Sequence, residues 1–164
     1  MTDGSRLEVS AQGDREILFT RVFAAPREAV FDAHVTPELV RRWMIGLEGM
    51  SLPVCEIDPR EGGALRFVWR RPDGTEMGMS GVHHQVERPS RLVHTELFDQ
   101  DWTGGEAVAT TVFEAAVGGT VMTITMRYVS RQARDAVLAS GMSQGMAMCY
   151  DRLDKLLAST ADGA

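Results

Sequence analysis

Apolar and polar positions alternate along most of the chain in the way that is typical of β-strands. Residues 15–23 are rich in β-branched and aromatic side chains and predict a first strand, which ends before Pro26. Glycines and prolines typical of turns then separate six further segments of strand-like pattern. We expect these strands at residues 52–58, 64–71, 76–87, 91–98, 107–116 and 120–128. Consecutive hairpins of this kind predict one antiparallel sheet of about seven strands.

Two short helices are predicted between the first strand and the hairpins. The first begins at Pro26, whose fixed φ suits a first helical turn, and it turns Val30 and Phe31 toward the interior. The second begins at Thr36, a residue type that caps helices, followed by Pro37. Both helices are too short to cover a sheet, so we expect them to close one end of it.

A long amphipathic helix is predicted at the end of the sequence, from Ser130 as its cap to about Ala158. Its apolar positions recur every three or four residues and comprise Leu138, Met142, Met146, Cys149, Leu153 and Leu156. This helix should lie across the concave face of the twisted sheet. A helix cannot follow a curved sheet along its whole length, so a pocket is expected between them. Gly141 and Gly145 would admit close contact with the sheet or leave volume for the pocket.

Strand alternation indicates which side chains face this pocket. Leu65, Phe67 and Trp69 share one face of their strand, and we expect that face to point toward the helix. The candidate ligand-binding residues are aromatic, thioether and imidazole side chains: Trp43, Phe67, Trp69, Met77, Met79, His83, His94, Trp102, Met122, Met142 and Met146. Further candidates for the same interior are Phe98, Ile124 and Met126. Each of these side chains could also be ordinary core, but ten methionines in 164 residues favour an adaptable lining.

The histidines do not have the spacing of a metal site. His83 and His84 are neighbours on a strand and therefore point to opposite faces, so no metal is expected. His83 or His94 could act as a general base, accept or donate a hydrogen bond to a ligand oxygen, or serve a structural role. The sequence contains no GxSxG, Walker-type, HExxH or strand-linked GxGxxG motif. We therefore expect none of the corresponding hydrolase, nucleotide or redox mechanisms, and no cofactor.

Length and charge narrow the classes of partner. A chain of 164 residues fits one domain with a sizeable core. We place this domain at residues 15–158, between a flexible polar leader (1–14) and a short tail (159–164). The net charge of −6 opposes binding to nucleic acid or to an anionic membrane surface, so neither partner is expected. A homodimer is left open by the sequence.

Cysteine usage and the absence of targeting segments bear on the compartment. Cys55 and Cys149 lie far apart and form no CxxC motif, which favours reduced thiols over a disulfide framework. The first residues lack the apolar stretch of a signal peptide, and no window approaches the roughly 18 apolar residues of a membrane span. A cytoplasmic protein is the resulting expectation.

Several short motifs carry a resemblance to a known family. They are residues 57–64 (IDPREGGA), 72–76 (PDGTE), Gly81, 89–93 (PSRLV), 141–142, Gly145 and 151–153 (DRL). The sequence resembles the activator of heat-shock-protein ATPase homologue family, within the START-like (SRPBCC, polyketide-cyclase-like) superfamily, from about Arg15 to Ala158. This resemblance implies an α+β helix-grip fold, similar to that of Bet v-like proteins. Many relatives have Trp where this chain has Met146, which implies a softer and roomier pocket wall.

Three functions follow from the fold and the resemblance. The first is binding of a small apolar or amphipathic molecule between sheet and helix. The second is a cyclase-like, aromatase-like or hydrolase-like enzyme that uses a pocket histidine. The third, implied by the family name alone, is a co-chaperone, although the eukaryotic activator engages the chaperone through a separate N-terminal domain that the residues before Arg15 could not form. The sequence identifies neither the ligand nor the pocket entrance.

Overall fold

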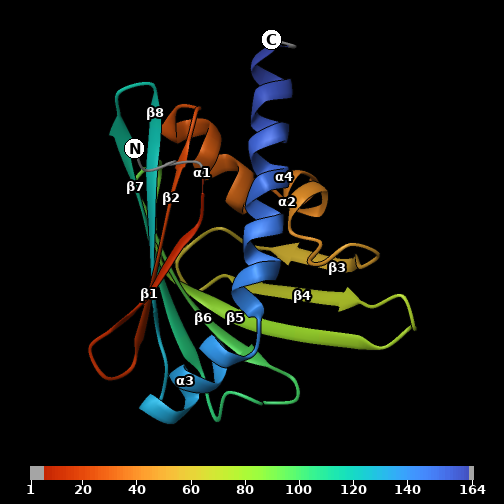
Figure 1. Cartoon of the computed structure of the whole chain (residues 1–164). Helices are drawn as coiled ribbons and strands as arrows, with labels where there is room; N and C mark the ends of the chain where they lie inside the picture. Colours follow the sequence, from red (N-terminus) through yellow and green to blue (C-terminus); the bar gives the residue numbers. More distant parts are fainter. Residues whose placement is uncertain (1–5, 163–164) are drawn as a thin grey trace.

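One antiparallel sheet curves around a long helix in the computed structural model, which describes residues 6–162 (Figure 1). The strands are β1 (Glu8–Gln12), β2 (Glu16–Phe23), β3 (Ser51–Ile57), β4 (Ala64–Arg70), β5 (Glu76–Glu87), β6 (Arg91–Phe98), β7 (Ala107–Ala116) and β8 (Gly119–Arg127). The helices are α1 (Arg27–Val35), α2 (Pro37–Trp43), α3 (Arg131–Ala139) and α4 (Met142–Asp162). The sheet order is β1-β2-β8-β7-β6-β5-β4-β3, so the hairpins of residues 51–127 form a continuous meander. The predicted α+β helix-grip fold is confirmed.

The sheet contains eight strands in the described residues, one more than the pattern predicts. The extra strand, β1, lies within the expected leader and pairs antiparallel with β2, from Glu8 opposite Thr20 to Gln12 opposite Glu16. This segment is polar because most of its side chains are exposed at the sheet edge, and polarity hid its strand character. At the other end, α4 continues through the first residues of the expected tail. Residues 1–5 of the leader and 163–164 of the tail lie outside the described residues.

The two short helices form where the sequence predicts them. Val30 and Phe31 of α1 are buried, and Pro37 occupies the first turn of α2. Thr36 stands at the N-cap position of α2, but its side chain makes no capping hydrogen bond. Thr36 therefore occupies the predicted cap position, but its side chain does not cap the helix.

The predicted C-terminal helix is divided into α3 and α4. Ser130 caps α3 as expected, accepting a hydrogen bond from the Ala133 amide at 3.0 Å. Gly141 then has φ +80°, a left-handed conformation that glycine adopts readily and that ends a helix. The break explains why Leu138, expected on the apolar stripe, is 37% exposed: it belongs to α3 and not to the helix that crosses the sheet.

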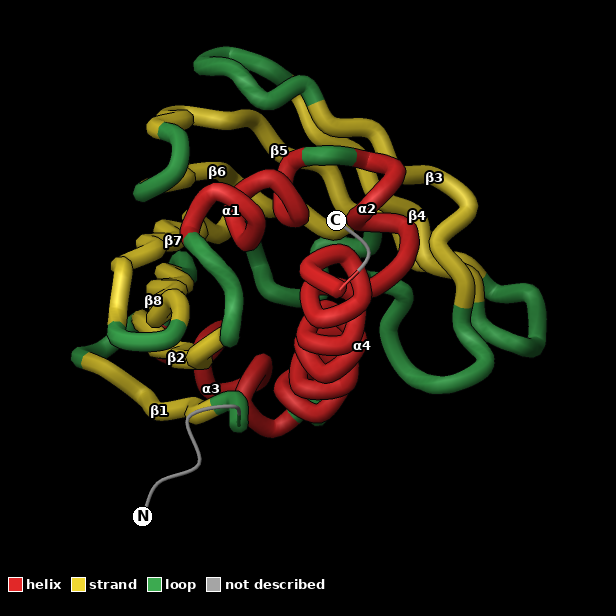
Figure 2. The backbone as a smooth tube through the Cα atoms, turned by 90° about the horizontal axis from the view of Figure 1, so that it is seen from above, coloured by secondary structure: helices red, strands yellow, loops and turns green. Residues whose placement is uncertain are grey.

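The arrangement around α4 determines where space remains. Viewed nearly along α4, the strands form an open arc around the helix, and α1 and α2 lie inside this arc beside α4 (Figure 2). The elements that approach α4 most closely are the other helices, above all α2. Arg21 on β2 joins the sheet to the middle of α4 through Asp151 at 2.9 Å and Asp154 at 3.1 Å. In the described part of the chain, no helix is long and apolar enough to span a membrane.

Candidate functional site

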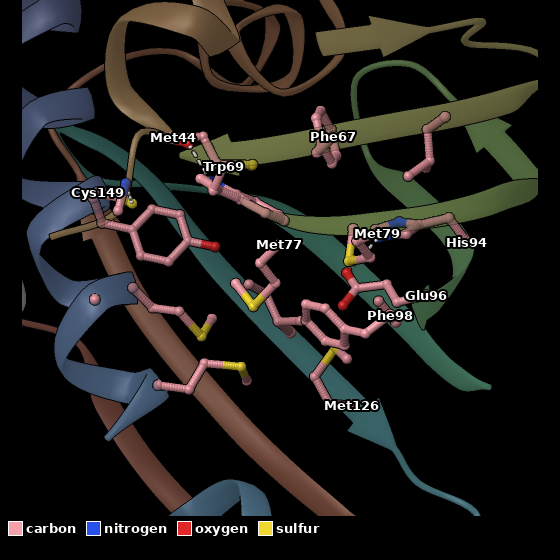
Figure 3. Close-up of a pocket in the computed structure, with 18 of the residues that line it drawn as sticks. Met44, Phe67, Trp69, Met77, Met79, His94, Glu96, Phe98, Met126 and Cys149 are labelled. Carbon is pink, nitrogen blue, oxygen red and sulfur yellow. Dashed lines mark hydrogen bonds and ion pairs between the residues drawn. The ribbon is translucent and has the colours of Figure 1, made fainter. Parts of the chain in front are cut away.

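A cavity of about 590 Å³ lies between the N-terminal part of α4 and the inner face of the sheet. Its wall comes from β3 to β8, from α1, α2 and α4, and from the segments that follow α2, β6 and α3. Thioether, aromatic and aliphatic side chains dominate this wall (Figure 3). The volume is within the range of small-molecule sites in proteins.

The structure brings most of the predicted site residues together on this wall. Those that line the cavity are Trp43, Phe67, Trp69, Met77, Met79, His83, His94, Trp102, Met142 and Met146. Phe98, Ile124 and Met126 line it as well. Met122 does not: it shares a face of β8 with Ile124 and Met126 but is fully buried in the core, opposite Arg21 and Phe113 in the sheet. Alternation selects the correct face of β8, whereas only the position of α4 decides which residues on that face border empty space.

The N-terminal part of α4 leaves the space because its side chains there are small or flexible. Gly145 borders the cavity, and a Cβ atom at this position would meet no atom within 4 Å. Met142 and Met146 lie on the same part of the helix and remain partly exposed. Of the two roles considered for Gly145, leaving pocket volume is the one that matches the structure.

Hydrogen-bonded tryptophans make the side of the wall near α2 rigid. The Trp69 indole donates a hydrogen bond to the carbonyl of Met44 at 2.9 Å, just after α2. The Trp43 indole donates to the carbonyl of Ala33 on α1 at 2.9 Å, and its ring stacks on Tyr150 of α4 with centroids 5.5 Å apart. Because both polar indole groups already have partners, they offer the cavity their apolar ring surfaces.

His34 is a lining residue that sequence reasoning missed. It lies on α1, where its Nδ1 is 2.8 Å from the carbonyl of Val30, and its ring is surrounded by Trp43, Phe113 and Tyr150. Nδ1 must donate to that carbonyl, so the neutral ring leaves Nε2 without a proton. Burial lowers the pKa of His34 to about 4, and the imidazole is neutral at pH 7. The helical turn from Val30 to His34 was a detectable signal, since it places both residues on one face.

Glu96 is the second lining residue that was missed. It lies between His94 and Phe98 at two-residue spacing on β6, so all three side chains share one face of the strand. The reasoning that selected the other two therefore also places Glu96 inward. Its Oε2 lies 2.9 Å from Nε2 of His94, and the two side chains are 22% and 20% exposed.

His83 completes the polar corner of the cavity. Its ring centroid is 6.0 Å from that of His94, and its Nδ1 is 3.3 Å from the carbonyl of Gly63. Burial, and next the proximity of His94, lower the pKa of His83. His84 is exposed on the opposite face of β5, as strand alternation predicts. The corner thus holds one carboxylate and two imidazoles, groups capable of hydrogen bonding and proton transfer.

Cys149 borders the cavity as a buried thiol. Its sulfur accepts a hydrogen bond from the Gly46 amide at 3.3 Å, and Arg152 donates to the carbonyl of Gly46 at 2.6 Å. Burial raises the pKa of Cys149, so the sulfur is a protonated, weakly polar wall atom. Cys149 therefore holds the loop after α2 against α4.

The rim of the cavity combines exposed apolar and polar side chains. Leu47, from the loop after α2, and Trp102, from the loop after β6, are 49% and 39% exposed. Trp102 packs on Phe98 with ring centroids 5.5 Å apart. Arg71 and Gln100 border the cavity and are exposed. These two loops flank the side on which the cavity meets solvent.

Solved structures show the same fold in bacterial proteins. The chain is similar to a crystal structure of a protein from Rhodobacter sphaeroides, with 34% identity, coverage of 94% of this chain and 99% of that chain, and a TM-score of 0.89. A protein from Nitrosomonas europaea is 22% identical, with 93% and 99% coverage and a TM-score of 0.82. A protein from Silicibacter pomeroyi, named AHSA1, is 22% identical, with 88% and 99% coverage and a TM-score of 0.73.

The family comparison agrees with the motifs in the sequence. No curated protein matches the chain. The family model described as "Activator of Hsp90 ATPase homolog 1-like protein" matches residues 24–158, which include every helix and strand from α1 to β8 and most of α4. With this match and the Rhodobacter sphaeroides relative, the chain belongs to the family of activator of Hsp90 ATPase homolog 1-like proteins.

Proposed function

We propose that the protein binds a small apolar or amphipathic molecule in the cavity between sheet and α4. The observation that carries the proposal is the cavity itself: about 590 Å³ of space bordered by methionine and aromatic side chains. Removing apolar ligand surface from water is favourable at about 25 cal/mol per Å². The START-like fold of this family commonly binds ligands in a cavity.

The character of the wall supports binding of a ligand by shape and apolar contact. Met77, Met142 and Met146 are flexible thioethers and can adapt to ligands of different outline. Trp43 and Trp69 lie on the same wall and are held by hydrogen bonds to the backbone. A lining that combines fixed aromatic rings with adaptable thioethers suits a flat, apolar ligand.

Titration with the neutral fluorescent dye Nile red tests the proposal. The dye's fluorescence should rise on binding and saturate with one site per chain. Gly145→Phe should weaken binding by about tenfold or more, because the added ring occupies the cavity. Gln144→Phe is the matched control: it introduces the same side chain at an exposed neighbouring position that does not line the cavity, and it should leave affinity unchanged. Equal affinity in all three proteins, or no saturable binding, would contradict the proposal.

The paired His94 and Glu96 favour a second candidate, acid–base catalysis on a bound molecule. A carboxylate that orients an imidazole is a common arrangement for a general base. The two candidates differ in the fate of the ligand. Binding alone predicts that a ligand incubated with the protein is recovered unchanged by mass spectrometry. Catalysis predicts a product that disappears in a His94→Gln variant.

A further inference from the structure

Glu96 is the only carboxylate among the described residues that line the cavity. We infer that the pair of Glu96 and His94 recognises the hydroxyl group of a neutral ligand whose remaining surface is apolar. The inference rests on the proposed binding function and specifies the chemical class of the ligand.

The hydrogen-bonding state of the pair leaves acceptor atoms free. Nε2 of His94 lies 2.9 Å from Oε2 of Glu96, and an ionised carboxylate can only accept, so Nε2 is the donor. In the tautomer with a single proton on Nε2, Nδ1 is an acceptor. Among the residues that the structure describes, neither Oε1 of Glu96 nor Nδ1 of His94 has a hydrogen-bond partner, and neither is a buried orphan. An ionised carboxylate only accepts hydrogen bonds. A ligand matches these atoms when it brings a donor.

The apolar neighbours of Glu96 strengthen a hydrogen bond between its carboxylate and a ligand. Phe98 lies two residues along β6 on the same face, and Met79 lies opposite Phe98 on β5. In Figure 3 the carboxylate of Glu96 projects between His94 and Phe98 toward the cavity. Hydrogen bonds are stronger in such low-dielectric surroundings than in water. The pKa of Tyr128 is raised, mainly by burial and in addition by the negative charge of Glu96.

The same charge disfavours anionic ligands such as fatty acids. A carboxylate on the ligand would meet Glu96 without a compensating cation nearby. Among the described lining residues, Arg71 is the only lysine or arginine, and it lies exposed at the rim, where it donates a hydrogen bond to Thr75 at 3.4 Å. The net charge of −6 acts in the same direction. Neutral donors are therefore selected over anions of equal shape.

Three compounds of the same shape separate these chemistries: 4-phenylphenol, biphenyl and biphenyl-4-carboxylate, each measured by displacement of Nile red near neutral pH. With the unmodified protein, 4-phenylphenol should bind about tenfold or more tightly than biphenyl, as hydrogen bonds to charged groups typically provide. The carboxylate should bind most weakly of the three.

Two variants attribute the preference to Glu96. Glu96→Leu removes both the acceptor and the charge, and it should reduce the preference for 4-phenylphenol over biphenyl to about twofold or less. Glu114→Leu, at an exposed position on β7, is the control and should retain the full preference. Saturable Nile red binding by each variant verifies that its cavity is formed. His94→Gln should lower the preference less than Glu96→Leu does, because the charged acceptor remains.

The possible failures are distinguishable. If the unmodified protein binds biphenyl and 4-phenylphenol equally, or binds the carboxylate most tightly, the inference about the hydroxyl group is wrong while cavity binding stands. If Glu96→Leu keeps the full preference, another group recognises the hydroxyl and the inference is again wrong. If neither Nile red nor any of the three compounds binds, the proposed function fails as well.

Discussion

The two halves of α4 serve opposite purposes. Its C-terminal half lies over a closely packed region, which we call the closed half: Phe23, Phe31, Phe113, Met122 and Leu153, each at most 2% exposed. Its N-terminal half lies over the open half, which is the cavity bordered by Met142, Gly145 and Met146. The helix pattern is apolar in both halves. Whether an apolar helix face becomes core or cavity wall therefore depends on the size of the side chains opposite it and on how far the sheet lies from it.

The closed half contains aromatic pairs and a charged anchor. Phe31 and Phe113 meet edge to face with centroids 5.8 Å apart, and Phe23 meets Tyr150 in the same way at 5.9 Å. Arg21, 2% exposed, joins β2 to α4 through two aspartates. In the open half, the first turns of α4 carry Met142, Gly145 and Met146 and no aromatic residue before Tyr150. The closed half thus holds the helix in place, and the open half can remain partly empty.

The largest expected difference between the halves concerns stability. Phe113→Ala should lower the free energy of unfolding by about 3–5 kcal/mol, since it removes a fully buried ring. Met146→Ala should lower it by less than about 1 kcal/mol, because Met146 already borders empty space. Urea denaturation of both variants measures the contrast. Equal losses would mean that the two halves are packed alike.

The anchor of the closed half should show the next largest effect. Replacing both Asp151 and Asp154 by alanine leaves the buried Arg21 charge without a carboxylate, at an expected cost of about 3 kcal/mol. As a control, Asp58→Ala disrupts an exposed pair with Arg60 and should cost less than about 1 kcal/mol. Thermal and urea unfolding test both. A double variant as stable as the control would show that the anchor does not hold α4.

His34, which contacts both halves, should make stability depend on pH. Its pKa is about 4 in the folded protein, below the ordinary value of 6.5, so the unfolded chain binds more protons between these values and stability falls as the pH falls. From about pH 7 to about pH 5 the expected loss due to His34 is about 2 kcal/mol. His34→Phe should reduce the pH dependence of unfolding by that amount. An unchanged pH dependence in this variant would contradict the assigned neutral state.

The smallest predicted effect is at Gly145, which borders the cavity; Gly119, next to Phe23 of the closed half, provides the contrast. Gly145→Ala should stabilise the protein by about 0.5–1 kcal/mol, since alanine favours a helix and the new methyl group meets no atom within 4 Å. Gly119→Ala, at the start of β8, should destabilise it by about 1–3 kcal/mol, because the methyl group would collide with the carbonyl of Phe23. Opposite signs in calorimetry support the distinction between open and closed halves. Destabilisation by Gly145→Ala would argue against free space there.

The limits of prediction from the sequence are visible at individual residues. Alternation placed Phe67, Trp69 and Met79 inward, because successive side chains on a strand point to opposite faces. The same rule places Glu96 inward together with His94 and Phe98, although the predicted lining did not include it. Met122 shows the reverse error: its inward direction was correct, but no local pattern indicates how far α4 lies from each strand.

Local chemistry thus determined the strands after the first, the short helices, the Ser130 cap and the resemblance to a family, because turns, caps and alternation depend on neighbours in sequence. Gly141 separates α3 from α4 by its local conformation, whereas tertiary structure alone decided that β1 joins the sheet and that the space under Met146 remains partly empty. Tertiary structure also brought His34 from α1 and Glu96 from β6 to the same cavity. These outcomes depend on distances between elements remote in sequence, and those distances follow from the packing of the whole domain.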